Sequence, residues 1–157
     1  MIRILFVCLG NICRSPMAEA VLADMIKSER LDGQIETDSA GIGNWHTGEP
    51  PHYETRAILQ KNDIAYTGLT ARQIRQRDWE RFDYIIGMDE QNINDLKAMH
   101  QISDKSPMVA KLMDFVNDPE EENIPDPYYT GNFAYTYQLV STGCANLLAY
   151  IKDKHHL

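Results

Sequence analysis

A cysteine and an arginine with five residues between them lie near the start of the chain, in the stretch Cys8-Leu9-Gly10-Asn11-Ile12-Cys13-Arg14-Ser15. A loop that winds through this spacing can turn its backbone N–H groups inward and bind an anion. The planar guanidinium of Arg14 can hold two phosphate oxygens at once, and the same positive field favours the thiolate form of Cys8. The pattern therefore predicts a phosphate-binding loop in which Cys8 is the nucleophile.

The other residues of this stretch suit the same chemistry. Gly10 lets the backbone approach an anion closely, and Asn11 tolerates a left-handed conformation from which its amide can brace the loop. The hydroxyl of Ser15 can donate a hydrogen bond to the Cys8 sulfur and ease its departure from a phosphoenzyme. The predicted phosphate-binding residues are Leu9, Gly10, Asn11, Ile12, Cys13, Arg14 and Ser15.

The spacing alone would also fit a buried core thiol and a surface arginine, since cysteine is often buried in proteins. The surroundings favour the functional interpretation, because an apolar strand candidate precedes the loop and Ser15-Pro16 opens a helix candidate. A nucleotide-binding P-loop is excluded, because the chain has no Gly-x4-Gly-Lys-Ser/Thr stretch.

A candidate general acid lies in the polar stretch 117–131, which holds five acidic residues and three prolines. Asp126 stands between Pro125 and Pro127, which stiffen the position of its carboxylate. A carboxylic acid near the pocket could protonate a departing oxygen. Most acidic residues of such a loop are solvated, so the stretch by itself leaves the choice among them open.

The elements that must position these residues alternate between strands and helices. Strands are predicted at Ile2–Val7, Ile35–Ala40, Ile64–Tyr66, Phe82–Met88 and Val109–Phe115, and helices at Met17–Ser28, Tyr53–Lys61, Glu90–His100 and Phe133–Lys154. Pro16 is expected at the first helical position. This alternation predicts an α/β fold in which a parallel sheet has helices on both faces, as one domain over residues 1–157. Ligands in such folds lie at the carboxyl ends of the strands.

Composition limits the classes of partner and the compartment. The formal charge of −8 disfavours nucleic acid and anionic membranes as partners, because both reward a basic surface. The three cysteines, Cys8, Cys13 and Cys144, form no disulfide framework, and no secretory signal or membrane-length apolar stretch occurs. We therefore expect a protein of the reducing cytoplasm.

The segment from Val7 to Pro16 closely resembles the active-site signature of low-molecular-weight protein tyrosine phosphatases. Asp126-Pro127-Tyr128 resembles the general-acid motif of that family, and further landmarks match at Ser39-Ala40-Gly41, Trp45-His46-x-Gly48, Ala71-Arg72-Gln73 and Met88-Asp89. The resemblance implies a four-stranded parallel sheet of the flavodoxin-like, phosphotyrosine phosphatase I type. It also implies hydrolysis of phosphotyrosine and small aryl phosphates through a phosphocysteine, without metal or cofactor, by a monomer or a weakly self-associating protein.

The same resemblance implies roles for individual residues. Cys8, Arg14 and Asp126 would be catalytic, and Trp45, Tyr128 and Tyr129 would wall a substrate pocket. Cys13 could form a reversible disulfide with the nucleophile, whereas Cys144 falls on the apolar stripe of the last helix. In one place the chain departs from the pattern: many relatives carry a histidine that helps to brace the loop asparagine, and Leu69 and Thr70 occupy that stretch here.

Two rival functions would also use a phosphate-binding loop. A thiol-dependent arsenate reductase shares the fold and loop but needs further cysteines to relay a disulfide, and only Cys144 lies beyond Cys13. A non-catalytic phosphate-binding module needs neither a nucleophile nor an acid, so Cys8 together with Asp126 argues against it. The five histidines show no metal-ligand spacing, and a solvated position is expected for each of them.

Overall fold

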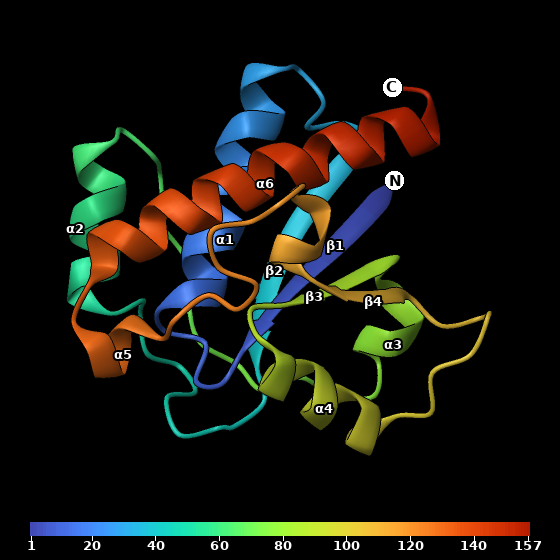
Figure 1. The fold of residues 1–157 in the computed structure, drawn as a ribbon, viewed down its shortest axis with the longest axis horizontal. Helices are drawn as coiled ribbons and strands as arrows, with labels where there is room; N and C mark the ends of the chain where they lie inside the picture. The colour runs from blue at the N-terminus through green and yellow to red at the C-terminus, as the bar shows by residue number, and fades with distance from the viewer.

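A computed structural model describes residues 1–157 and has one parallel sheet at its centre (Figure 1). Its strands are β1 (Ile2–Cys8), β2 (Ile35–Gly41), β3 (Tyr84–Gly87) and β4 (Met108–Lys111), in the order β2-β1-β3-β4. The central strands are buried on both faces and read as almost continuous apolar runs, as parallel strands do. The predicted four-stranded parallel sheet is confirmed.

Helices cover both faces of this sheet, as the alternation of elements predicts. They are α1 (Arg14–Ser28), α2 (Tyr53–Lys61), α3 (Asp78–Arg81), α4 (Glu90–Met99), the 3₁₀ helix η1 (Leu112–Phe115), α5 (Pro127–Thr130) and α6 (Phe133–His155). Successive β1 side chains point to opposite faces. Ile4 and Phe6 join the larger apolar cluster beneath α1 and α6, while Leu5 and Val7 join a smaller cluster against α3 and α4.

Two predicted strands were wrong in whole or in part. Ile64–Tyr66 is not a strand: Ile64 is buried just after α2, where its N–H donates to the carbonyl of Leu59 and closes the helix end. Its apolar character therefore reflects a helix-end contact rather than a sheet. The strand predicted at Val109–Phe115 ends at Lys111, because the chain turns there into η1.

The helices differ from the prediction mainly in two ways. The short helices α3 and α5 were not predicted, since four-residue helices carry too little periodicity to be recognised. Helix α1 begins at Arg14, so Pro16 is its third residue and not its first. The missing N–H of a proline costs nothing there, because the first four N–H groups of a helix have no partner within it.

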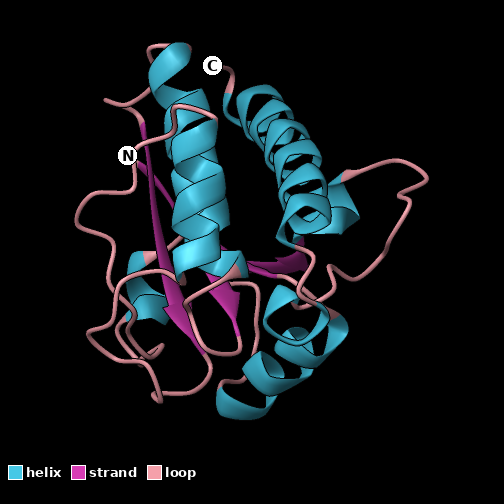
Figure 2. Cartoon of the chain, turned by 90° about the vertical axis from the view of Figure 1, so that its left-hand side faces the viewer, coloured by secondary structure: helices cyan, strands magenta, loops and turns pink.

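Several loops lie together at the carboxyl edge of the sheet. Figure 2 shows the strand arrows pointing into this group of loops, which includes those that follow β1 and β2. Gly41, at the end of β2, forms an isolated parallel bridge with Gln73 and so ties the segment before α3 to the same edge. No helix combines the length and the apolar character needed to cross a membrane.

Candidate active site

Cys8 ends the central strand β1, and residues 9–13 carry the chain directly into α1. Asn11 adopts a left-handed conformation with φ of 58°, and its N–H points back toward the sulfur. The Cys8 Sγ accepts this N–H at 3.3 Å and lies 2.9 Å from the Oγ of Ser15. Cys8 is only 3% exposed, so both polar contacts are made to a largely buried sulfur.

Arg14, on the first turn of α1, is buried and held by acidic groups of two distant segments. Its Nη1 donates to Asp89 Oδ2 at 2.6 Å and to the Ile124 carbonyl at 2.8 Å, while Nη2 lies 3.4 Å from Asp126 Oδ2. Burial lowers the pKa of Arg14, but the negative charges of Cys8, Asp126 and Asp89 outweigh this effect and raise it overall. The Nε group has no hydrogen-bond partner although it is buried.

Asp126 caps the short helix α5, which fixes its carboxylate at the loop. Its Oδ1 accepts the Tyr128 N–H at 3.1 Å, and its Oδ2 faces Arg14. The structure therefore brings Cys8, Arg14 and Asp126 together, as the sequence predicts. None of the other acidic residues in 117–131 forms an ion pair with Arg14.

Asp89 belongs to this site but received no role from the sequence. It follows β3 at the carboxyl edge of the sheet, and it also caps α4, where its Oδ1 accepts the Asn92 N–H at 2.8 Å. One oxygen therefore holds the helix while the other holds Arg14. The signal that could have found it is its position, because ligand-binding side chains of parallel sheets cluster after the strands.

A cavity of about 210 Å³ opens over the Cys8 sulfur. It is lined by Cys8, Leu9, Gly10, Ile12, Cys13, Trp45, His46, Asp126, Tyr128 and Tyr129. All three predicted aromatics lie on its wall, and Trp45 and Tyr129 remain 66% and 74% exposed, so they stand at its mouth. A flat, largely apolar wall of this kind suits an aromatic ring.

The expectation that every histidine is solvated holds only in part for His46, His52 and His100, which are half-buried. His46 lines the cavity and pairs with Glu49 at 2.5 Å. His52 stacks on Phe133 with ring centroids 4.9 Å apart, and His100 stacks on Trp79 at 4.2 Å. Sequence spacing could not show the two stacked contacts, because Phe133 and Trp79 come from segments separate from those of their histidines. No group of three or more His, Cys, Asp or Glu side chains is arranged to hold a metal ion.

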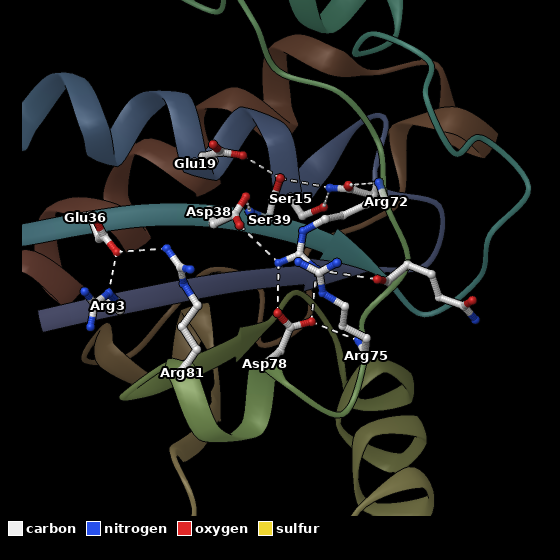
Figure 3. A network of polar contacts seen from close by, with 12 residues as sticks. Arg3, Ser15, Glu19, Glu36, Asp38, Ser39, Arg72, Arg75, Asp78 and Arg81 are labelled. Atoms are coloured by element: carbon white, nitrogen blue, oxygen red, sulfur yellow. Dashed lines mark hydrogen bonds and ion pairs between the residues drawn. The ribbon is translucent and has the colours of Figure 1, made fainter.

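The loop asparagine is braced without a histidine. Asn11 Nδ2 donates to Ser15 Oγ at 2.8 Å and to Ser39 Oγ at 2.9 Å, and its Oδ1 accepts the backbone N–H of Arg72 at 3.0 Å. The Arg72 side chain is in turn fixed by Asp38 and Asp78, as Figure 3 shows. Leu69, near the position of the histidine in relatives, packs against the apolar core instead.

The remaining cysteines differ from Cys8 in environment. Burial, followed by the charges of Asp126 and Cys8, raises the pKa of Cys13 to about 12. Cys144 is fully buried on α6 and contacts the Ala18 carbonyl at 3.7 Å, which confirms its predicted place in the core. Burial raises the pKa of Cys144 as well, so both groups are thiols at neutral pH.

Comparison with known proteins gives consistent matches over the whole chain. The family model described as low molecular weight phosphotyrosine protein phosphatase matches residues 3–157. The low molecular weight protein-tyrosine-phosphatase YfkJ of Bacillus subtilis is 50% identical over 157 residues, which is 100% of both chains. PtpA of Staphylococcus epidermidis, with the same description, is 44% identical over 151 residues, or 96% of this chain and 94% of that protein.

Solved structures agree with these sequence matches. The crystal structure of YfkJ superposes with a TM-score of 0.95 and covers 98% of this chain and 96% of its own, at 50% identity. The crystal structure of DARP, a Drosophila arginine phosphatase, has a TM-score of 0.87 at 32% identity, covering 95% of this chain and 97% of its own.

Proposed function

The chain belongs to the low molecular weight phosphotyrosine protein phosphatase family and hydrolyses phosphotyrosine, and we propose that it does so through a phosphocysteine on Cys8. The observation that carries this mechanism is the unpartnered Nε of Arg14. Together with Nη2, which Asp126 holds only at 3.4 Å, it offers two parallel N–H donors beside the Cys8 loop. Such a fork matches two oxygens of a phosphate.

In the first step the Cys8 thiolate attacks phosphorus, and the bond from phosphorus to the tyrosine oxygen breaks. Asp126 gives its proton to that oxygen, so that tyrosine leaves as a neutral phenol. Arg14 and the inward N–H groups of the loop balance the charge that spreads over the remaining phosphate oxygens. Phosphocysteine and an ionised Asp126 are the products.

In the second step a water molecule attacks the phosphocysteine. Asp126, now a carboxylate, takes a proton from that water, and the bond between sulfur and phosphorus breaks. Inorganic phosphate forms and the sulfur leaves as a thiolate, which the nearby Ser15 hydroxyl stabilises at 2.9 Å. Neither step needs a metal ion, because the loop supplies the positive charge and the nucleophile.

Phosphotyrosine fits the cavity better than phosphoarginine, the substrate class named for one structural relative. The wall over the sulfur is formed mainly by aromatic and aliphatic side chains, and Asp126 is the one carboxylate among them. A phenyl ring gains from contact with such a wall, whereas a polar guanidino group would lose hydration there and find Asp126 as its one carboxylate partner.

A comparison of two peptides, one with phosphotyrosine and one with phosphoarginine, tests the mechanism and the preference together. We expect wild-type turnover of the phosphotyrosine peptide, undiminished by excess chelator and blocked by vanadate, a mimic of five-coordinate phosphorus. Cys8→Ser should be inactive. Loss of activity on chelation, or turnover by Cys8→Ser, would rule out the phosphocysteine mechanism, and faster phosphoarginine hydrolysis would reverse the substrate assignment.

We also propose a phosphotyrosine-bearing protein as the partner and the cytoplasm as the compartment. The acidic composition and the three free cysteines support this assignment. The Cys8→Ser variant should retain phosphoproteins from a lysate and release them to vanadate. Sedimentation should show a monomer or weak self-association. Binding that vanadate does not displace would mean that the captured proteins occupy another surface.

A further inference from the structure

Glu19 lies on α1, away from the cavity, yet its carboxyl group is linked to the nucleophile. Its Oε1 accepts a hydrogen bond from Ser39 Oγ at 2.6 Å. Ser39 accepts from Asn11 at 2.9 Å, Asn11 donates to Ser15 at 2.8 Å, and Ser15 lies 2.9 Å from the Cys8 sulfur. Figure 3 shows Glu19, Ser39 and Ser15 aligned along this path.

The hydrogens of this chain of contacts can be assigned one by one. The amide nitrogen of Asn11 has two hydrogens, and Ser15 and Ser39 take one each. The Ser15 oxygen is therefore an acceptor toward Asn11, and its own hydrogen is free for the Cys8 sulfur. Likewise the hydrogen of Ser39 is free for Glu19. Ionised Glu19 can only accept, so it holds the Ser39 hydroxyl in this direction.

We propose that Glu19 is a positioning residue whose carboxylate fixes the direction of the hydrogen bonds through Ser39, Asn11 and Ser15, so that Ser15 donates to the Cys8 thiolate. This inference rests on the proposed function, because it concerns Cys8 as nucleophile and leaving group. Glu19 touches neither substrate nor sulfur. It acts by keeping the Asn11 amide in the orientation in which its oxygen accepts the Arg72 N–H.

The surroundings of Glu19 raise its pKa into the neutral range. Burial raises the pKa of Glu19 to about 7, a rise that the Ser39 hydrogen bond opposes. Within this net value, Asp38 on β2 adds to the rise, and Arg72, from the segment before α3, opposes it. A protonated Glu19 has a hydrogen of its own to give and no longer fixes the Ser39 hydroxyl. The contribution of Glu19 to turnover should therefore grow as pH rises through about 7.

The test compares kcat for wild type and Glu19→Gln from pH 5.5 to 8.5, with a phosphotyrosine peptide. The ratio of the two values cancels the titrations of Asp126 and substrate, which both proteins share. We expect the ratio to rise from about 2 at the acid end to about 10 at the alkaline end, the effect of one misdirected hydrogen bond, with KM changed less than about twofold. Asp24→Asn, an exposed change on the same helix, should give a ratio near one throughout.

A double-mutant cycle with Ser39→Ala separates positioning from damage to the fold. If Glu19 acts through Ser39, Glu19→Gln should cost almost nothing further in the Ser39→Ala background. A ratio that is flat or falls with pH, or losses that simply add, would overturn the inference. These outcomes are distinct from failure of the proposed function, which would show as turnover by Cys8→Ser whatever residue stands at 19.

Discussion

Arg14 divides its guanidinium between the Asp89 carboxylate, the Ile124 carbonyl and a long contact to Asp126. In the proposed mechanism, the phosphate would replace Asp126 at Nη2 and so free that carboxyl group to face the leaving oxygen. In Arg14→Lys the charge stays but the two-pronged grip is lost. We expect kcat/KM to fall by about 10²-fold or more for phosphotyrosine peptides, the scale of one lost transition-state donor.

Arg81→Lys is the matched control, because Arg81 lies on α3 and its side chain is 62% exposed. Its kinetics should equal those of wild type. Steady-state assays on both variants, with circular dichroism to verify folding, decide the matter. Near-normal turnover by Arg14→Lys would mean that another group clamps the phosphate.

Asp126 can be tested against its crowded acidic loop. Phenol has a pKa of about 10, so its unassisted departure at neutral pH is costly. Asp126→Asn should slow phenyl phosphate turnover by about 10²- to 10⁴-fold and flatten the alkaline limb of the pH profile. The loss should shrink for esters whose leaving group is a weaker base, as a series of substituted aryl phosphates would reveal.

Asp118→Asn is the companion variant for this measurement. Asp118 is exposed and has a positive φ of 47°, a conformation that asparagine also adopts readily. The Asp118→Asn substitution should change turnover little. If both variants lost the same modest amount of turnover, or if the effect of Asp126→Asn did not depend on leaving-group basicity, another group would have to be the proton donor.

Whether the role of a single residue could be predicted from the sequence depended on how close its partners lie along the chain. Cys8, Arg14 and Ser15 share one short stretch, so their spacing and the strand and helix candidates on either side were enough to predict a phosphate-binding loop. Glu19 and Asp89 act through contacts with residues far along the chain, such as Ser39 and Arg14. No spacing links such pairs, and only the register of the sheet brings them together.

At the scale of elements, the phosphate loop holds two cysteines, Cys8 at its start and Cys13 next to Arg14. Peroxide should oxidise the Cys8 thiolate to a sulfenic acid, which Cys13 can then attack to form a disulfide and release water. The pKa of Cys13 is about 12 partly because the Cys8 charge opposes its ionisation. Oxidation of Cys8 removes that charge and makes Cys13 a better nucleophile.

Mild peroxide should accordingly inactivate the enzyme, and thiol should restore wild type more fully than Cys13→Ala. Mass spectrometry should find the Cys8–Cys13 disulfide in wild type and in Cys144→Ala, but not in Cys13→Ala. Cys144→Ala is the control, since Cys144 is buried in the core and should not affect recovery. If Cys13→Ala recovered as completely as wild type, Cys13 would have no protective role.

Elements within a long apolar or periodic run could be predicted from sequence, and isolated short helices could not. β1, the apolar run 82–88 that contains β3, and the periodic face of α6 carry enough residues to show their type. Four-residue helices such as α3 and α5 do not. The apolar residues around Ile64 misled, because burial against the end of α2 and burial in a strand leave the same local signature.

For the molecule as a whole, Glu19 makes a contribution to the free energy of unfolding that depends on pH. Its folded pKa of about 7 lies above the ordinary value of 4.5, so folding favours the protonated form. The cost of ionising it in the fold is absent below about pH 4.5, grows between the two values and is complete above about pH 7. Wild type should therefore lose stability over this window as pH rises.

Glu19→Gln removes this term. Its unfolding free energy should exceed that of wild type by on the order of 1–3 kcal/mol at pH 8 and match it near pH 4.5. Urea unfolding at several pH values, with Asp24→Asn as control, measures the difference. A variant that is more stable yet slower at pH 8 would show that the carboxylate is kept for turnover; an equal offset at every pH would contradict the assigned titration.

The amide of Asn11 reaches three separate parts of the chain at once, namely Ser15, Ser39 and the backbone of Arg72. For protein engineering, this means that the loop is not a portable motif. Residues 8–15 grafted onto the first strand of another parallel sheet would bring the nucleophile and the arginine, but two of the three partners of the amide would be left behind. A working transplant must include the end of the neighbouring strand and the crossing segment that bears Arg72.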